Sequence, residues 1–512
     1  MTETTVICLR DSDDVAVAVA TIPEGTSIAH AGQSITARQA IPAGHKIAIR
    51  AVAEGAPVYK YAVPIGMAKT DIESGDHVHV HNLAPANTGG KYEFSTDVRT
   101  VDYLPAEDVP TFDGYARADG RAGTRNYIAL ISTVNCSATV THEIAQQANE
   151  KLLQDYPNVD GVAPFAHFSG CSPKRGVAGY DDLTRVLAGI AKNPNVGGYL
   201  VIGLGCEGTQ PLSLIEDRGL VQIGRPDERP PVITLQECGG VRKTIAEGLR
   251  VVAEMLPRVN DITRTPQPIS KIMLATECGG SDAYSGITAN PAVGNAVDRL
   301  VQCGGTAILS ETTEIYGAEH LMTRRAVNRE TGEKLLDLLK EWDRYLTMYG
   351  MQCNNNPSRG NIDGGLSNIV EKSLGAVAKS GTTPLQAVYG YAETVTESGL
   401  VIMDSPGYDP PSVAGMVAGG ANMVTFTTGR GSCFGLKPAP VIKIATNTPM
   451  YEHMRDDMDV NAGTILQGVS VEDMGGQILA EIIAVASGKQ SCSERNEVGD
   501  HEFIPWVRGA TV

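Results

Sequence analysis

From Tyr127 to the C-terminus, short and almost continuously apolar runs alternate with segments of helical period. Runs such as YIALISTV, GYLVIGLG, KIMLAT and LVIMDS end in small or polar residues, and helical patterns follow most of these apolar runs. Strands that are apolar on both faces are typical of parallel sheets covered by helices on both sides. We therefore predict a multidomain α/β chain, with a middle α/β domain at 116–262 and a doubly wound parallel sheet at 263–512.

The N-terminal segment has a different pattern. Residues 1–92 read as short strands separated by Gly, Pro and Asp turns, which predicts a compact all-β module. Residues 93–115 are acidic, contain two prolines and lack a period, so we predict a linker there. Within the α/β part, ITRTPQPISK at 262–271 is the expected break between its two regions.

Composition limits the possible partners. The 512 residues include 42 Lys and Arg against 59 Asp and Glu, a net charge of −17, which argues against binding nucleic acid or an anionic membrane. A small anionic substrate is still compatible, because a local pocket can be positive on an acidic protein. The sequence has no membrane-length apolar run and no secretory signal pattern, and its ten cysteines are expected to be reduced. We expect a cytoplasmic protein.

A G-x-G-x-x-G motif follows one of the predicted strands, at Gly203–Gly208. Such a motif suggests a dinucleotide site and hence an oxidoreductase. Two features weaken this interpretation: the motif lies deep in the sheet region, and Cys206 and Glu207 in its interior would crowd a pyrophosphate.

Other glycine-flanked polar motifs also stand where strands should end. Ligands bind outside the carboxyl ends of parallel strands, so we expect these loops to converge, and their thiols and carboxylates suit iron or zinc. The alternative is that small Cys and Gly residues simply permit tight turns. The candidate metal ligands are Cys136, Cys171, Cys206, Glu207, Cys278 and Asp282.

The all-β module carries the histidines of interest. In the sequence GDHVHVHN, a strand would place His77, His79 and His81 on one face, which suits a metal or anion site. Exposed strand residues are the alternative. His45 and Lys46 follow a turn and pair an imidazole with an ammonium group, a combination suited to holding a carboxylate.

Two later stretches add charged groups. Glu311 and Glu314 end a predicted strand and are candidates for metal ligation or proton transfer. The sequence NPSRGN at 356–361 precedes a predicted helix at 365–379 and fits anion recognition. On that helix we expect Glu371 and Lys372 to lie on a solvated face.

Long motifs along the chain resemble those of the altronate/galactarate dehydratase family of sugar-acid hydro-lyases. They include GHKIAI, HVHVHN, DGRAGTRN, ECGGSDAYSGITANPAVG, NPSRGN and TTGRGSCFG. The resemblance implies an N-terminal SAF-type β-clip domain, a middle domain with a dimerisation role and a Rossmann-like catalytic C-terminal domain. It also implies a homodimer and a divalent metal, usually Fe²⁺, with Mn²⁺ or an iron–sulfur cluster as alternatives.

The chemistry of such a dehydration fits the residue types. A base removes the proton α to the carboxylate, a metal stabilises the resulting charge, and an acid protonates the departing hydroxyl. The resemblance implies catalytic roles for the β-module groups His45, Lys46, His77, His79 and His81. It implies substrate binding by Arg125, Asn126, Arg359, Asn361 and Arg430.

The resemblance is greatest to enzymes acting on altronate. The alternatives are a galactarate dehydratase, a sulfolactate-type lyase, a dinucleotide-dependent oxidoreductase and a non-catalytic ligand-binding protein. The fusion of the β module to the main region argues against the sulfolactate-type lyase.

Overall fold

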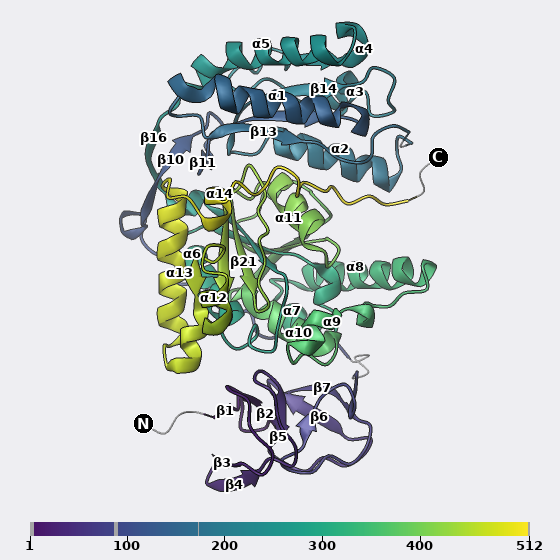
Figure 1. Ribbon diagram of the computed structural model, residues 1–512, viewed down its shortest axis with the longest axis vertical. Coiled ribbons are helices and arrows are strands. Elements are labelled where there is room, and N and C mark those ends of the chain that lie inside the picture. The colour runs from purple at the N-terminus through teal and green to yellow at the C-terminus, as the bar shows by residue number, and fades with distance from the viewer. Residues whose placement is uncertain (1–4, 86–90, 173, 510–512) are drawn as a thin grey trace.

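The structure is a computed structural model that describes residues 5–85, 91–172 and 174–509. Figure 1 shows a small strand-rich module at one end, a central sheet covered by helices, and a second helix-covered sheet at the other end. This arrangement agrees with the predicted α/β multidomain fold. Within the described residues, no helix is long and apolar enough to cross a membrane.

The β module is built from short antiparallel strands joined by glycine turns. Its first sheet has the order β1-β2-β5-β8, and a second has the order β6-β7-β9, beside the hairpin β3-β4. Its small core consists largely of Ile and Ala side chains. The strands are β1 (Val6–Ile7), β2 (Val15–Ala18), β3 (Ser27–His30), β4 (Gln33–Thr36), β5 (Lys46–Ala48), β6 (Pro57–Lys60), β7 (Val63–Ala68), β8 (His77–Val78) and β9 (Leu83–Pro85).

The segment predicted as a linker is more ordered than expected. Strand β10 (Thr111–Ala116) begins inside it and pairs with β11 (Ala122–Gly123) and with β16 (Arg264–Pro268). The residues before β10 bond to the C-terminal region, as when the Ser95 amide donates to Thr323 and the Leu104 amide to Gln302. The segment that enters the middle region is therefore paired with the segment that leaves it. The acidic, proline-containing sequence did not predict this pairing.

The middle region is a parallel four-stranded sheet of order β13-β12-β14-β15. Helices α1 and α5 pack together on one face, while α2 and α3 pack on the other. The strands are β12 (Tyr127–Ser132), β13 (Gly161–Phe165), β14 (Val196–Gly203) and β15 (Val232–Thr234). The helices are α1 (Ala138–Lys151), α2 (Ala178–Ala191), α3 (Pro211–Arg218), α4 (Leu235–Cys238) and α5 (Val241–Asn260).

The C-terminal region is a parallel seven-stranded sheet of order β19-β20-β18-β17-β21-β22-β23. Helices α6 and α13 cover one face, and α11 covers the other, where it also meets α2 of the middle region. The strands are β17 (Met273–Cys278), β18 (Thr306–Leu309), β19 (Leu385–Tyr389), β20 (Gly399–Met403), β21 (Met423–Thr428), β22 (Val441–Ala445) and β23 (Val460–Asn461). The helices are α6 (Ala289–Gln302), α7 (Glu319–Arg325), α8 (Arg329–Met348), α9 (Arg359–Asp363), α10 (Ile369–Ala376), α11 (Asp409–Ala418), α12 (Thr448–His453), α13 (Val471–Ala486) and α14 (Cys492–Arg495).

A buried carboxylate joins the β module to the C-terminal region. Glu371 on α10 bonds the ammonium groups of Lys46 and Lys60, both at 2.9 Å, and its side chain is 0% exposed. The prediction that Glu371 and Lys372 lie on a solvated helix face is therefore wrong. The reason is visible in the sequence IVEKSLGA, because apolar and small residues surround the charges and leave α10 without a polar face.

Burial and pairing shift the pKa values of these groups in opposite directions. Burial opposes ionisation of Glu371, but Lys46 and Lys60 outweigh it and lower its pKa to about 2. Burial lowers the pKa of Lys46 to about 8, although Glu371 opposes that shift. The carboxylate is thus held ionised inside the protein by two cations from the β module.

Glu371→Gln should destabilise the folded chain strongly. The change leaves two buried ammonium groups without their counter-charge, and breaking a buried ion pair on one side costs about 3–5 kcal/mol. Chemical denaturation of both proteins measures the loss. Glu333→Gln is the matched control, since Glu333 pairs with Arg329 on the surface of α8, where a lost pair costs about 1 kcal/mol or less. Equal losses in the two variants would contradict this account.

Candidate functional site

The strand order of the C-terminal sheet reverses between β17 and β21, which is where an open α/β sheet binds ligands. The loop after β17 runs from Gly279 to Asp282, and the loop after β21 contains Gly429 and Arg430. These loops are tied together, because the amides of Gly429 and Arg430 both donate to the Gly280 carbonyl. The sequence motifs ECGGSD and TTGRG thus meet at one point.

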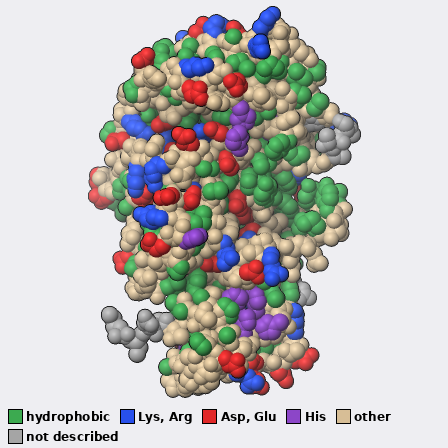
Figure 2. All heavy atoms as spheres, in the orientation of Figure 1, with side chains coloured by type: hydrophobic (Ala, Val, Ile, Leu, Met, Phe, Trp, Pro, Cys, Tyr) green, Lys and Arg blue, Asp and Glu red, His purple; other side chains and the backbone are tan. Residues whose placement is uncertain are grey.

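The β module places its histidines against the same edge. Nε2 of His45 lies 3.3 Å from the Asp363 carbonyl oxygen at the end of α9. A Cβ on Gly44 would lie 3.4 Å from the Gly364 oxygen, and a Cβ on Gly364 would lie 3.4 Å from Cδ of Arg430. The turn at Gly364 therefore lies between the loop that carries His45 and the side chain of Arg430, close to both. Figure 2 shows the histidine patch where the β module meets the larger part of the molecule.

The histidines form one cluster. Nδ1 of His45 lies 2.9 Å from Nε2 of His77, and the rings of His77 and His79 stack with centroids 5.4 Å apart. One nitrogen from each of His45, His77 and His79 can be chosen so that all three lie within 4.8 Å of one another. His81 is exposed, with its ring centroid 5.3 Å from that of His77.

The local backbone differs from the predicted strand. Strand β8 ends at Val78, and His79–Asn82 form a turn in which Asn82 bonds the amide of His79 and the carbonyl of His77. The Asn82 side chain closes the turn and competes with continued strand pairing. The rings come together through this turn, and His45 on the neighbouring strand edge joins them.

Burial keeps the clustered imidazoles neutral. It lowers the pKa of His45, that of His77 to about 3 and that of His79 to about 4, and neighbouring cationic groups add to each effect. A neutral imidazole has a free lone pair, which is what a metal ion requires. The three nitrogens are therefore a preformed donor set.

Two predicted substrate-binding arginines reach solvent near this cluster. Arg359 on α9 is 88% exposed and pairs only with Asp363 one turn later. Arg430 is also exposed. Asn361 lies between them in sequence and is buried, where it caps α9 through Ser358 and donates to the Ser281 carbonyl, so it positions the loop after β17.

Beneath these loops lies a buried nest of charges, which we call the carboxylate–lysine nest. Lys379 pairs with Glu311 at 3.1 Å, and Lys372 pairs with Glu314 at 2.6 Å. Cys278 lies 3.5 Å from Glu311, whose backbone adopts the left-handed conformation with φ of 62°. The nest consists of Glu277, Cys278, Glu311, Glu314, Lys372, Lys379 and Asp409.

The nest holds more carboxyl groups than ammonium groups. Burial, Glu311 and Asp409 raise the pKa of Glu277, whereas the two lysines outweigh burial and lower the pKa of Glu311. Oε1 of Glu277 is buried and has no hydrogen-bond partner among the described residues. Burial and the charges of Glu311 and Glu314 raise the pKa of Asp409 to about 7. Glu277 and Asp409 therefore hold their protons to a higher pH than exposed carboxyl groups do.

Sequence reasoning found Glu311 and Glu314 but missed Lys372 and Lys379 as their partners, and it missed Lys60 as a partner of Glu371. Lys60, Lys372 and Lys379 each stand among apolar or small residues, and that pattern marks a buried charge. Lys46 was predicted to be catalytic, but it is fully buried and donates to Gly365 and Glu371. It positions the β module instead.

The predicted metal-ligand set is divided between two sheets. Cys136, Cys171 and Cys206 follow strands of the middle sheet, whereas Cys278 is the last residue of β17 in the C-terminal sheet. Asp282 is buried and accepts from Ser285, Thr446 and Asn447. The expectation that all these loops converge is therefore wrong, because two parallel sheets have two carboxyl edges.

Two other predicted residues have structural tasks. Arg125 is buried, forms an ion pair with Glu494 and donates to the carbonyls of Thr124, Val485 and Lys489. Asn126 is buried and bonds the carbonyls of Asn158 and Val259. These bonds use their donors, so the substrate-binding role predicted for both is replaced by one in holding regions of the chain together.

The G-x-G-x-x-G loop is filled by its own glutamate. Glu207 is buried and accepts from the amides of Leu204 and Gly205 and from Thr133. Those amides are the groups that a pyrophosphate would need. This occupancy disfavours the dinucleotide interpretation, and it gives Glu207 a loop-organising role rather than the predicted metal-binding one.

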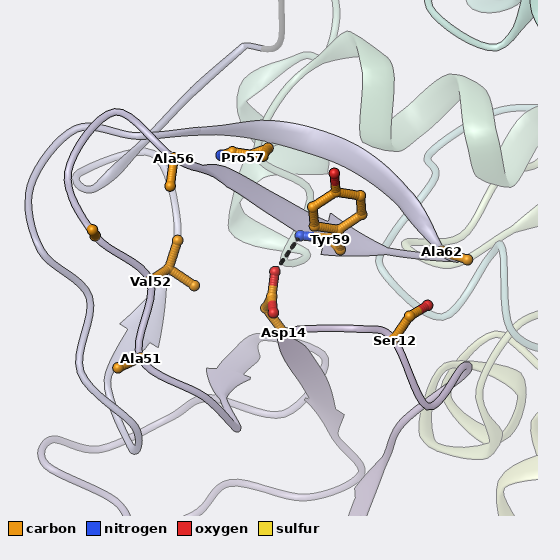
Figure 3. Close-up of a pocket in the computed structure, with 9 residues that line it drawn as sticks. Ser12, Asp14, Ala51, Val52, Ala56, Pro57, Tyr59 and Ala62 are labelled. Carbon is orange, nitrogen blue, oxygen red and sulfur yellow. Dashed lines mark hydrogen bonds between the residues drawn. The ribbon is translucent and has the colours of Figure 1, made fainter.

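A separate hollow of about 500 Å³ lies within the β module. Figure 3 shows that small side chains line it and that Asp14 accepts from the Tyr59 amide at its rim. Its lining includes none of the clustered histidines. The histidine edge, rather than this hollow, is the candidate active site.

The fold and site define a multidomain α/β enzyme with an appended β module. Three family models match the chain: Altronate/galactarate dehydratase SAF domain at 4–86, D-galactarate dehydratase/Altronate hydrolase, second domain at 114–260, and D-galactarate/Altronate dehydratase, C-terminal at 269–511. The chain belongs to the altronate/galactarate dehydratase family of hydro-lyases.

Full-length relatives agree with this assignment. The chain is 34% identical to altronate dehydratase of Escherichia coli (strain K12), over 95% of this chain and 96% of that one. It is 37% identical to galactarate dehydratase (L-threo-forming) of the same organism, over 94% and 93% of the two chains. It is 33% identical to altronate dehydratase of Bacillus subtilis (strain 168), over 96% and 97%.

Asp409→Asn should change the pH dependence of stability. Between about pH 4 and pH 7, folded Asp409 keeps a proton that the unfolded chain releases, so its contribution to stability falls as pH rises through this window. The variant should gain on the order of 1 kcal/mol over the wild type at pH 8 relative to pH 5. Denaturant unfolding at both pH values measures this. Asp337→Asn, at an exposed site on α8, should show no such difference, and an equal response of both variants would overturn the assignment.

Proposed function

We propose that this enzyme converts D-altronate to 2-keto-3-deoxy-D-gluconate with the help of a divalent metal, Fe²⁺ or Mn²⁺. The observation that carries the proposal is the cluster of three imidazoles, which contacts the end of α9 through the Asp363 carbonyl, beside the turn at Gly364 that packs against Arg430. Membership in the altronate/galactarate dehydratase family supports the reaction class.

The donor set suits the proposed metal. Imidazole nitrogen binds iron and other first-row divalent ions well, and His45, His77 and His79 offer three such atoms within 4.8 Å of one another. A bound divalent ion supplies Lewis acidity toward the substrate carboxylate. The residues supply the rest: Arg359 and Arg430 attract the carboxylate, and the Gly364 turn leaves room between them and the histidines.

We assign the proton transfers to one exposed base and to one acid of the carboxylate–lysine nest. His81 is exposed beside His77, so in this proposal it takes the proton from the carbon next to the carboxylate. The hydroxyl on the following carbon leaves with a proton as water, and the enol that remains becomes the 2-keto acid. Asp409 of the carboxylate–lysine nest, with its pKa raised to about 7, is the proposed proton donor to the leaving hydroxyl.

Galactarate is the second candidate substrate, because the galactarate-dehydrating relative is as similar to this chain as the altronate-dehydrating ones. A sulfolactate-type activity is a weaker alternative. The (2R)-sulfolactate sulfo-lyase subunit beta of Chromohalobacter salexigens is 31% identical over 77% of this chain. In that organism a separate alpha subunit matches a further 46-residue stretch, whereas here both parts form one chain.

Purified enzyme supplied with Fe²⁺ and a reductant should form a 2-keto acid from D-altronate. The parallel reactions contain Mn²⁺ in place of Fe²⁺, or galactarate in place of altronate, and product is measured as a 2-keto acid. Faster turnover of galactarate would transfer the substrate assignment to that acid. Absence of turnover with either acid and either metal would refute the proposal.

The histidines should divide into metal-holding and proton-transferring groups. His77→Ala should lower bound Fe²⁺ and activity together, while His81→Gln should keep the metal and lose about 10²-fold or more in kcat. Metal analysis after desalting, combined with steady-state kinetics, separates the two effects. His30→Ala, in β3 of the same module, is the control and should change neither. Full metal retention in His77→Ala would remove His77 from the proposed ligand set.

A further inference from the structure

Three cysteines follow three neighbouring strands of the middle sheet. Cys136 comes after β12, Cys171 after β13 and Cys206 after β14. The strand order β13-β12-β14 places β12 in the centre, and the order of the sheet reverses between β12 and β14. The thiols therefore stand at the carboxyl edge of this sheet, beside its own switch point, where ligands bind in open α/β sheets.

Direct hydrogen bonds tie the three loops to one another. The Asn135 amide donates to the Ser169 carbonyl at 3.0 Å, which joins the first loop to the second. The Gly208 amide donates to the Cys171 carbonyl at 2.6 Å, which joins the second to the third. Thr133 donates to Glu207 at 2.8 Å, which joins the first to the third. Every pair of loops is in contact, so the cysteine positions are fixed relative to one another.

The backbones approach too closely for larger residues. A Cβ on Gly170 would lie 2.0 Å from the Thr133 carbonyl oxygen, and a Cβ on Gly205 would lie 2.6 Å from Oε1 of Gln236. Both glycines also adopt positive φ, 99° and 125°. The glycines thus let the loops close over the strand ends while each cysteine next to them faces outward.

The exposure of these thiols is unusual for cysteine, which is among the residues most often buried. Cys136, Cys171 and Cys206 are all exposed and free. Thr209, whose amide donates to the Gly170 carbonyl, is fully buried, and its hydroxyl has no hydrogen-bond partner among the described residues. Three outward thiols on loops that contact one another indicate a site for a metal-containing group.

Helix α1 begins two residues after Cys136, so the amide end of this helix lies next to the first cysteine loop. Glu207, the nearest carboxylate in sequence, is turned inward onto backbone amides and does not compete for a ligand.

The three thiols do not form a ready-made site for a single ion. A single tetrahedral ion bound at 2.3 Å by thiolates requires sulfur atoms about 3.8 Å apart. The described residues contain groups whose ligand atoms lie within 4.8 Å of one another, and the three thiols are not one of these groups. A multinuclear centre holds its thiolates farther apart, because each binds a different metal atom.

We propose that Cys136, Cys171 and Cys206 bind a [4Fe–4S] cluster through three of its irons, with the fourth iron free of protein thiolate. Thiolates are the usual ligands of such clusters. The cysteines bind as thiolates after releasing their protons. This site is distinct from the histidine edge, and the proposal does not rest on the proposed sugar-acid activity.

The test is anaerobic reconstitution of the full-length protein with iron salts and sulfide, followed by desalting. Iron and acid-labile sulfide are then quantified, and visible absorbance is recorded. The wild type should retain about four sulfides per chain, with about four irons in addition to any ion held by the histidines. Cys136→Ser, Cys171→Ser and Cys206→Ser should each lose most of both. Cys433→Ser is the matched control, since Cys433 is also an exposed free thiol but lies after β21.

The outcomes separate this proposal from the dehydratase proposal. His77→Ala should keep its sulfide, because the histidines belong to another edge. A wild type that retains no sulfide would overturn the cluster, whatever its activity toward altronate. Equal sulfide in the wild type and all three cysteine variants, or retention of one zinc ion without sulfide, would also overturn it. Thermal unfolding of each apo variant confirms that the exposed substitutions leave the fold intact.

Discussion

The position of the β module depends on one buried carboxylate. Glu371 lies between Lys46 and Lys60, and all three side chains are essentially inaccessible to solvent. Charges of this kind are costly to bury unless they are paired and further hydrogen bonded, and here the Gly365 carbonyl and the Ser367 amide complete the set. An alternative docking of the module would leave at least one of these charges unpaired, so the pairing selects one orientation.

That orientation makes the candidate active site. Lys46 pairs with Val78 of β8, the strand that carries His77, and His45 immediately precedes Lys46 in the sequence. Fixing Lys46 on α10 therefore fixes the imidazole cluster against α9. The next residue of α10 after Glu371, Lys372, pairs with Glu314 in the carboxylate–lysine nest. One helix thus connects the histidine edge to the buried acids through adjacent residues, and the separation of the two groups is set by covalent geometry.

The sequence was sufficient to predict the elements that follow from periodicity. Apolar strands alternating with helices indicated the parallel sheets, and Gly/Pro turns indicated the β module. It was insufficient where tertiary contacts prevailed over local pattern. Strand β10 forms in a segment without period because β16, about 150 residues later, supplies its partner. His79–Asn82 turn away from the strand because Asn82 binds the backbone. The burial of the Glu371 carboxylate follows from its pairing with Lys46 and Lys60, which lie far away in the sequence.

The same limit governs the candidate ligands. Periodicity shows that a cysteine or an acid stands at the end of a strand, but it does not show which sheet that strand joins. Cys206 and Cys278 occupy equivalent places in their local motifs, yet one belongs to the four-stranded sheet and is exposed, while the other belongs to the seven-stranded sheet and is buried beside Glu311. Burial raises the pKa of the Cys278 thiol, so that group remains protonated, whereas the Cys206 thiol is open to solvent. Cysteines in similar motifs therefore differ in chemistry because they stand at the edges of two different sheets.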